Sequence, residues 1–136
     1  MIKKKIAAFA AATIAACSVC ATAFATTYNV PKYSFGPNTL YQDGGHRTTQ
    51  SVKKEDDLSA WFNVEQGLSS GEAYVTFRVH KSSGAVATRT LDTWTNGERY
   101  IDYYSGDGKK DYYYYLEYYM EPQAVNSVYV GGIWAP

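Results

Sequence analysis

Cysteine is almost absent from this chain of 136 residues, and its two cysteines, Cys17 and Cys20, both lie near the N-terminus. The long remainder has no disulfide available and depends on burial of apolar side chains for its stability. Cys17 ends the sequence Ile-Ala-Ala-Cys, which is also typical of a lipoprotein signal. Lipid anchoring through Cys17 is therefore an alternative to free secretion.

Acidic residues are lacking before Asp43, whereas three lysines stand within the first five residues. An almost wholly apolar stretch over residues 6–16 follows, and then Ala-Phe-Ala at residues 23–25. This order predicts a signal peptide over residues 1–25 that is removed by cleavage. It predicts a secreted, extracellular domain over residues 26–136.

The predicted domain has 10 Lys and Arg against 13 Asp and Glu, a formal net charge of −3. This excess of acid argues against nucleic acid as a partner, because proteins neutralise phosphates with basic residues. No later apolar run approaches the roughly 18 residues that span a membrane, so no transmembrane segment is expected in the mature chain. The domain is long enough for one core but too short for the large α/β catalytic folds.

Helical periodicity is also lacking after residue 25, where apolar residues alternate with polar ones. The clearest alternation covers residues 72–80 and is typical of an antiparallel strand with one buried side. Strands are predicted over residues 33–36, 46–52, 58–65, 72–80, 85–94, 99–104, 112–121 and 127–134.

Turn signals separate these strands. Asn96-Gly97 has the residues of a two-residue hairpin, and Gly-containing loops lie at residues 69–71, 82–84 and 105–108. The last five strands are therefore predicted to form a meander of consecutive hairpins. The whole pattern predicts an all-β fold, an antiparallel β-sandwich of seven to nine strands that is Ig-like or jelly-roll-like.

Tyrosine is abundant, and nine of the 14 tyrosines lie between residues 100 and 119. The segment repeats itself, since Tyr-Ile-Asp-Tyr-Tyr at residues 100–104 returns as Tyr-Leu-Glu-Tyr-Tyr at residues 115–119. A turn at Asp107-Gly108 would fold the two copies into a hairpin that pairs Ile101 with Tyr114.

The two faces of this predicted hairpin differ in composition. The inner face contains the aliphatic residues and comprises Ile101, Tyr103, Tyr112, Tyr114, Leu116, Tyr118 and Met120. The outer face is the predicted ligand-binding site and comprises Tyr100, Asp102, Tyr104, Tyr113, Tyr115, Glu117 and Tyr119. Exposed aromatic rings stack on sugar rings, and tyrosine beside a carboxylate also attracts cations. The alternative is that the tyrosines only stabilise an exposed sheet face, since tyrosine is a strong strand former.

Signals for nucleophilic or histidine-based catalysis are weak. Residues 67–71 match the string G-x-S-x-G, but they lie between two strands, where the strained strand-to-helix elbow of the hydrolases is lacking. His80 is expected to be solvated at the end of a strand, and His46 has no obvious carboxylate neighbour in the sequence. No catalytic residue is predicted, and the protein is not expected to be an enzyme.

Metal and cofactor sites are not predicted either. Asp102, Asp107 and Asp111 surround one loop and have the hard oxygen donors that calcium prefers. Lys109 and Lys110, however, stand where such a site needs ligands.

Several short segments resemble uncharacterised small secreted proteins of Gram-positive bacteria. The matching segments are Tyr33 to Pro37, Arg47-Thr48-Thr49, the strand at residues 72–80, the tyrosine-rich hairpin and Val130 to Trp134. Some of those proteins are similar in build to the lactococcin-type β-sandwich bacteriocins. The resemblance implies an extracellular, non-enzymatic β-protein that contacts the bacterial envelope, and it carries over no functional residue.

Two functions are expected from these features. The first is a secreted binding protein that acts on cell-envelope or matrix polysaccharide, or on a surface protein, through the tyrosine-rich face. The alternative is a bacteriocin-like antimicrobial protein that acts on neighbouring Gram-positive cells.

Overall fold

A computed structural model describes residues 30–42, 44–68 and 71–136 of the chain, and Pro31–Pro136 form one compact unit. The predicted signal peptide and Cys17 lie outside these described residues, as does part of the G-x-S-x-G string. None of the described segments forms a helix of the length and apolarity that crossing a membrane requires.

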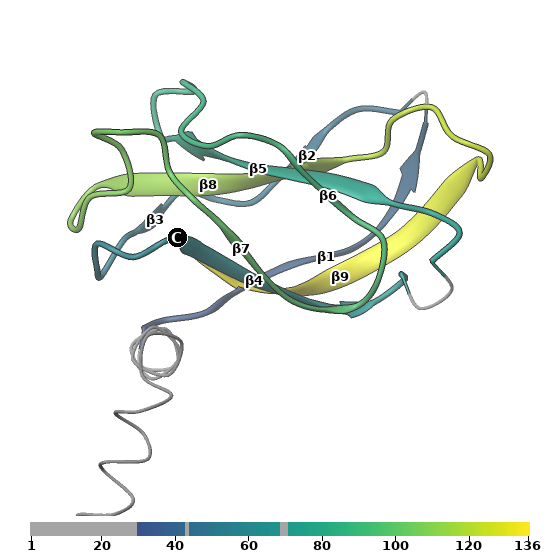
Figure 1. The fold of residues 1–136 in the computed structure, drawn as a ribbon, viewed down its shortest axis with the longest axis horizontal. Helices are drawn as coiled ribbons and strands as arrows, with labels where there is room; N and C mark the ends of the chain where they lie inside the picture. The colour runs from purple at the N-terminus through teal and green to yellow at the C-terminus, as the bar shows by residue number, and fades with distance from the viewer. Residues whose placement is uncertain (1–29, 43, 69–70) are drawn as a thin grey trace, which may run out of the picture. The chain divides into compact units, whose positions relative to one another are not determined.

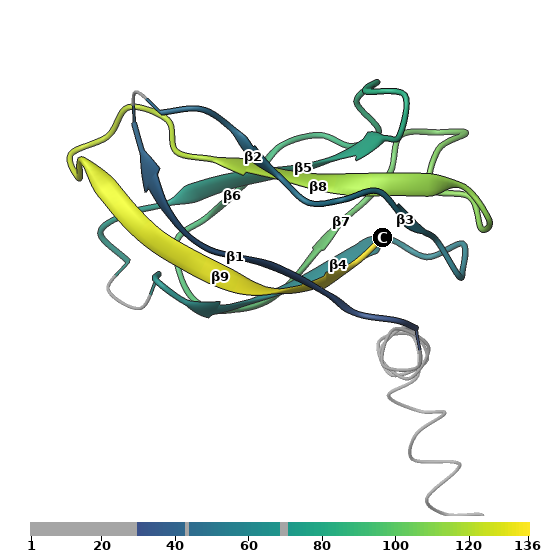
Figure 2. The same cartoon turned by 180° about the vertical axis from the view of Figure 1, so that it is seen from behind.

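The predicted all-β antiparallel sandwich is confirmed, and the described residues form nine strands in two sheets (Figure 1). The four-stranded sheet contains, in spatial order, β1 (Tyr33–Tyr41), β9 (Ser127–Ala135), β4 (Ala60–Gln66) and β7 (Gly97–Ile101). The five-stranded sheet contains β2 (Arg47–Thr48), β8 (Tyr113–Tyr119), β5 (Val75–Lys81) and β6 (Leu91–Thr93), and β3 (Val52–Lys53) also pairs with β8. Figure 2 shows the opposite side, where β1 follows β9 and the short strands β2 and β3 follow β8.

The core lies between the two sheets and uses the alternate residues of each strand. Val75, Phe77 and Val79 of β5 are fully buried, as the alternation in the sequence predicts. Phe62 of β4 meets Phe77 from the other sheet, with ring centroids 4.4 Å apart. Stacked aromatic rings of this kind contribute both buried area and favourable ring geometry.

Two glycines allow β9 to lie between β1 and β4. A Cβ atom on Gly132 would lie 2.0 Å from the carbonyl oxygen of Asn63, and a Cβ on Gly131 would lie 2.9 Å from Cα of Pro37. Close backbone approach therefore explains why the segment after Val130 begins with two glycines.

The predicted meander is wrong apart from one hairpin. β5 and β6 are paired as a hairpin would require. After β6, however, the chain changes sheet at every step, since β7 and β9 belong to the four-stranded sheet and β8 to the five-stranded sheet. Asn96 and Gly97 do not form a hairpin turn, because the strands on either side of them, β6 and β7, lie in different sheets. The side chain of Asn96 instead binds the backbone at and after the end of β4. Its Oδ1 accepts the N–H of Leu68 at 2.9 Å, and its Nδ2 donates to the carbonyl of Glu65 at 3.3 Å.

The predicted tyrosine hairpin is also wrong, because its two copies lie in different sheets. Ile101 of β7 is opposite Ala60 of β4, and Leu116 of β8 is opposite Val79 of β5. Pairing with the apolar strands β4 and β5 places each copy on a strand that is already half buried, which a hairpin of the two copies would not do. The copies meet across the sandwich, where the rings of Tyr103 and Tyr114 are 5.1 Å apart.

Most of the predicted inner face is correctly assigned in spite of this. Tyr103 is half buried against the core, and five further residues are buried: Ile101, Tyr114, Leu116, Tyr118 and Met120. Tyr112 is the exception, since 62% of it is exposed. Asp111 adopts a positive φ of 70° directly before it, which interrupts the alternation that the prediction assumed.

Candidate functional site

The seven predicted ligand-binding residues do not form one plate. Tyr113, Tyr115, Glu117 and Tyr119 alternate along β8 of the five-stranded sheet, whereas Tyr100 lies on β7 of the other sheet. The prediction of a continuous plate is therefore wrong, although its β8 half stays together.

Asp102 and Tyr104 follow β7 in the connection to β8, and both are exposed. The hydroxyl of Ser59 donates to Oδ1 of Asp102 at 2.5 Å. The N–H of Tyr104 donates to the carbonyl oxygen of Ala87 at 2.9 Å. These contacts attach both residues to segments other than β8.

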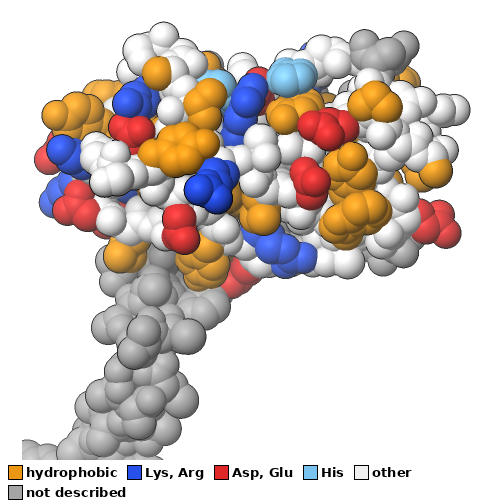
Figure 3. Space-filling view, turned by 45° about the horizontal axis from the view of Figure 1, so that its top comes forward, with side chains coloured by type: hydrophobic (Ala, Val, Ile, Leu, Met, Phe, Trp, Pro, Cys, Tyr) orange, Lys and Arg blue, Asp and Glu red, His pale blue; other side chains and the backbone are white. Residues whose placement is uncertain are grey.

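The outer side of β8 and β5, which we call the β8 face, carries the remaining predicted residues (Figure 3). Tyr113 is 52% exposed and Tyr115 is half buried. Tyr119 is buried because the ring of His46 stacks on it, with centroids 3.8 Å apart and planes only 3° from parallel. The exposed aromatic area of the β8 face therefore increases from Tyr119 towards Tyr113.

Glu117 lies in the middle of the β8 face and binds three side chains, which together we call the Glu117 centre (His46, Arg78, His80 and Glu117). Its Oε1 is 2.6 Å from Nδ1 of His46. Its Oε2 accepts the Nε–H of Arg78 and is 2.6 Å from Nε2 of His80. Arg78 is directly opposite Glu117 in the register of β5 and β8, so the period of two places Arg78 and His80 on the same side.

His80 contributes both of its ring nitrogens to this arrangement. Nδ1 lies 3.0 Å from the carbonyl oxygen of Gly84, while Nε2 faces Glu117. The ring also stacks on Tyr115, with centroids 5.0 Å apart. His80 is only 7% exposed, so the prediction of a solvated side chain is wrong.

The carboxyl group of Glu117 is ionised at neutral pH. Burial alone would raise its pKa, but the hydrogen bonds from Arg78, His46 and His80 outweigh this effect. Together they lower the pKa of Glu117 from 4.5 to about 2. The Glu117 centre is therefore an ionic network on an otherwise aromatic face.

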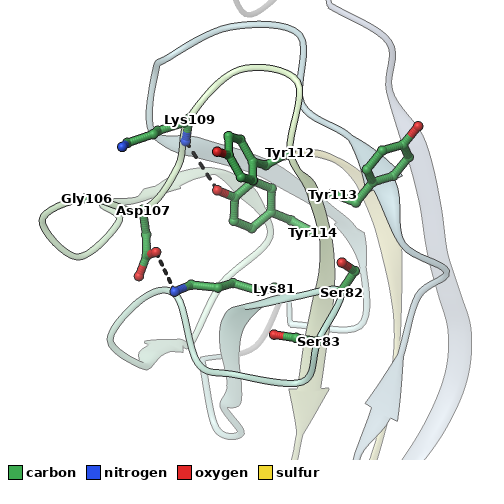
Figure 4. A pocket seen from close by; sticks show the side chains of 9 residues that line it. All are labelled: Lys81, Ser82, Ser83, Gly106, Asp107, Lys109, Tyr112, Tyr113 and Tyr114. Carbon is green, nitrogen blue, oxygen red and sulfur yellow. Dashed lines mark hydrogen bonds and ion pairs between the residues drawn. The ribbon is translucent and has the colours of Figure 1, made fainter.

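A pocket of about 380 Å³ opens at the Tyr113 end of β8, and we call it the strand-end pocket (Figure 4). It lies between the turn after β5 and the loop before β8. Its lining comprises Lys81, Ser82, Ser83, Gly106, Asp107, Lys109, Tyr112, Tyr113 and Tyr114.

Polar groups of the strand-end pocket are held in place by specific contacts. Nζ of Lys81 lies 2.7 Å from Oδ1 of Asp107, and this contact raises the pKa of Lys81. The hydroxyl of Tyr114 accepts the N–H groups of Gly108 and Lys109, at 2.9 and 3.2 Å. The loop before β8 is thereby fastened to the buried side of β8.

Aromatic and hydroxyl groups complete the lining. Tyr112 and Tyr113 are mostly exposed, and in Figure 4 the ring of Tyr113 points away from those of Tyr112 and Tyr114. Ser82 and Ser83 add hydroxyl groups from the turn after β5. Exposed rings beside fixed polar groups can stack on a sugar ring and bond its hydroxyls.

A second aromatic pair lies at the opposite end of β5. Thr93 pairs with Val75, and both are buried, so the next residues, Trp94 and Tyr74, face outwards. Their rings are 4.6 Å apart, and Trp94 is 48% exposed. From Tyr74 to Lys81 the strand is roughly 24 Å long at about 3.4 Å per residue.

Within residues 30–42, 44–68 and 71–136, no three His, Cys, Asp or Glu side chains converge as metal ligands would. The three aspartates of the loop have separate partners, namely Ser59 for Asp102, Lys81 for Asp107 and Lys53 for Asp111. A shared calcium ion is therefore not supported by their geometry.

The residues that surround Glu117, and most of those that line the strand-end pocket, were not among the residues predicted from the sequence. Arg78 and His80 alternate with the core residues of β5, which was a signal that they share one side. The sequence contains no comparable signal for His46, which is 71 residues from Glu117. Comparisons with protein-family models, with curated proteins and with solved structures give no match for this chain.

Proposed function

We propose that this protein acts outside the cell as a non-enzymatic binding protein for glycans of the bacterial envelope or matrix. The observation that supports this most is the strand-end pocket, in which Tyr112 and Tyr113 stand beside a fixed Lys81–Asp107 pair and two serine hydroxyls. Sugar recognition needs this combination of a flat apolar surface and convergent polar groups.

The β8 face provides room for more than one sugar ring. Tyr113 and Tyr115 continue from the pocket along β8, and Trp94 with Tyr74 stands beyond Tyr119. An extended glycan chain laid along β5 and β8 would contact aromatic rings at both ends and polar side chains between them.

The test is binding to purified Gram-positive cell-wall sacculi and to soluble polysaccharides, measured by sedimentation and by isothermal titration calorimetry. Replacing Tyr112 or Tyr113 with alanine should lower the affinity about 5- to 150-fold, the usual effect of truncating an aromatic hot spot by about 1–3 kcal/mol. The matched control is Tyr129→Ala, since Tyr129 is 53% exposed but lies on β9 of the other sheet.

Equal losses in Tyr129→Ala and Tyr113→Ala would show that the binding surface is not the strand-end pocket. The same wild-type protein should be added to a lawn of Gram-positive cells. Clearing of the lawn without binding to sacculi would contradict a binding module and support the antimicrobial alternative.

A further inference from the structure

The Glu117 centre surrounds one carboxylate with three nitrogen-bearing side chains. The carbonyl of Gly84 and the ionised carboxylate of Glu117 can only accept hydrogen bonds, and each faces one ring nitrogen of His80. Both nitrogens of His80 therefore lie opposite hydrogen-bond acceptors. One carboxylate is thus surrounded by the guanidinium of Arg78 and by the two imidazole rings of His46 and His80.

Two of these residues have further nitrogens besides the one that binds Glu117. Arg78 binds Glu117 through Nε, its side chain is 27% exposed, and its guanidinium carbon lies 5.7 Å from the ring centre of Tyr119. His46 uses Nδ1 for Glu117, and its side chain is 45% exposed. The guanidinium fork of arginine matches the geometry of carboxylate and phosphate groups.

From this geometry, and resting on the proposed function, we infer that the bound glycan carries oxyanions, which Arg78 and His46 bind between the rings of Tyr115 and Tyr119. The phosphate groups of a wall polymer and the carboxylates of an acidic polysaccharide share this chemistry. The strand-end pocket is compatible with such a ligand, since Lys81 and Lys109 outnumber Asp107 among its charged residues.

The remaining charges limit where the oxyanion can lie. The charges of Asp92 and Glu121 act on Tyr119, and Asp92 also accepts the hydroxyl of Thr76 at 2.8 Å. Asp92 belongs to β6, so these acids repel an anion on the β6 side of Tyr119. The oxyanion is therefore placed on the opposite side, where His46 stacks on Tyr119 and the guanidinium of Arg78 lies 5.7 Å from the centre of the Tyr119 ring.

The first experiment compares probes on the wild-type protein by isothermal titration calorimetry. The probes are poly(glycerol phosphate), polygalacturonate, neutral dextran and single-stranded poly(U) RNA, each at low and high salt. Poly(glycerol phosphate) and polygalacturonate, the two acidic polymers, should bind at least 10-fold more tightly than dextran. Added salt should reduce this difference in affinity. The stronger of the two shows whether phosphate or carboxylate is preferred.

The second experiment uses variants with matched charge changes. Arg78→Gln should weaken binding of the acidic polymers about 10- to 100-fold, the effect of losing charge-assisted hydrogen bonds. Arg47→Gln is the control, because this substitution removes the same charge at a position outside the β8 face. Arg47 is opposite Tyr118 in the sheet, and the side chain of Tyr118 faces the core. Arg78→Lys keeps a cation near Glu117 and loses the fork, so it should also bind weakly while remaining folded.

This inference would be overturned if dextran and the acidic polymers bound with equal affinity and Arg78→Lys bound the acidic polymers as tightly as the wild type. The proposed function as a glycan-binding protein would then still stand. Tighter binding of poly(U) than of either acidic polymer would overturn the glycan as ligand, and the proposed function with it. Should Arg78→Gln fail to fold, the probe comparison and Arg78→Lys still decide the outcome.

Discussion

Lys54 shows how much the environment of a single residue can depart from its type. Its side chain is fully buried, with Nζ 3.1 Å from Oδ1 of Asp56 and 5.0 Å from the ring centre of Tyr103. Burial lowers the pKa of Lys54, and the charge of Asp56 opposes this change. The hydroxyl of Tyr103 is also buried and has no partner among the described residues, and burial raises its pKa.

Asp56→Asn should destabilise the protein by about 3–5 kcal/mol, because it removes the carboxylate that is in contact with the buried ammonium group of Lys54. The measurement is the midpoint of urea unfolding at pH 7. Asp111→Asn is the matched control, since it removes a solvent-exposed ion pair with Lys53 and asparagine tolerates the positive φ of this position. Equal midpoints for the two variants would show that the buried pair is not needed.

At the scale of the element, β8 is the strand on which the sequence pattern and the structure agree best. Its alternation places Tyr114, Leu116 and Tyr118 in the core and leaves Tyr113 outside. The inner side of β8 therefore belongs to the core, whereas its outer side is exposed only towards Tyr113.

Leu116→Ala and Tyr114→Ala should lower the free energy of unfolding by about 2–5 kcal/mol, because both create cavities in the core. Tyr113→Ala should change it by less than about 1 kcal/mol, the usual range for an exposed cross-strand contact. Thermal unfolding followed by circular dichroism distinguishes the two groups. A large loss in Tyr113→Ala with none in Tyr114→Ala would contradict the assignment of the two faces.

The approach of β9 to its neighbours leads to another prediction. Gly132→Ala should destabilise the protein by about 1–3 kcal/mol, since the added methyl group would collide with the backbone of Asn63 and the ring of Phe35. Gly45→Ala is the control, because a Cβ atom there meets no heavy atom within 4 Å. Equal denaturation midpoints for the two variants would show that β9 can shift without cost.

At the scale of the whole molecule, Glu117 links the two histidines to the stability of the fold at low pH. Its pKa is lower in the folded state, about 2 against an ordinary value of 4.5. The unfolded chain binds more protons between these values, so the contribution of Glu117 is present above about pH 4.5 and is lost as the pH falls towards 2.

Glu117→Gln should therefore be less stable than the wild type at pH 6, and the difference should shrink as the pH falls from about 4.5 to 2. Urea unfolding at four pH values between 6 and 2 measures this convergence. The exposed Glu65→Gln is the control and should follow the wild type throughout. A constant difference between Glu117→Gln and the wild type would show that the carboxylate does not titrate in this range.

The sequence by itself determined the local properties of this protein. Alternation with a period of two decided that the described chain forms strands and no helix, and it assigned the inner and outer sides of β5 and β8 correctly. These properties depend on which face of a single strand is apolar, and a strand carries that information in its own residues.

Only the tertiary structure decided which strands pair and which side chains meet. The repeated tyrosine segments do not form a hairpin, since β7 pairs with β4 in one sheet and β8 pairs with β5 in the other. His46 reaches Glu117, 71 residues away in the sequence, because His46 directly precedes β2 and β2 pairs with β8. Such contacts depend on the burial of the whole core, whereas the pattern along one strand describes only that strand.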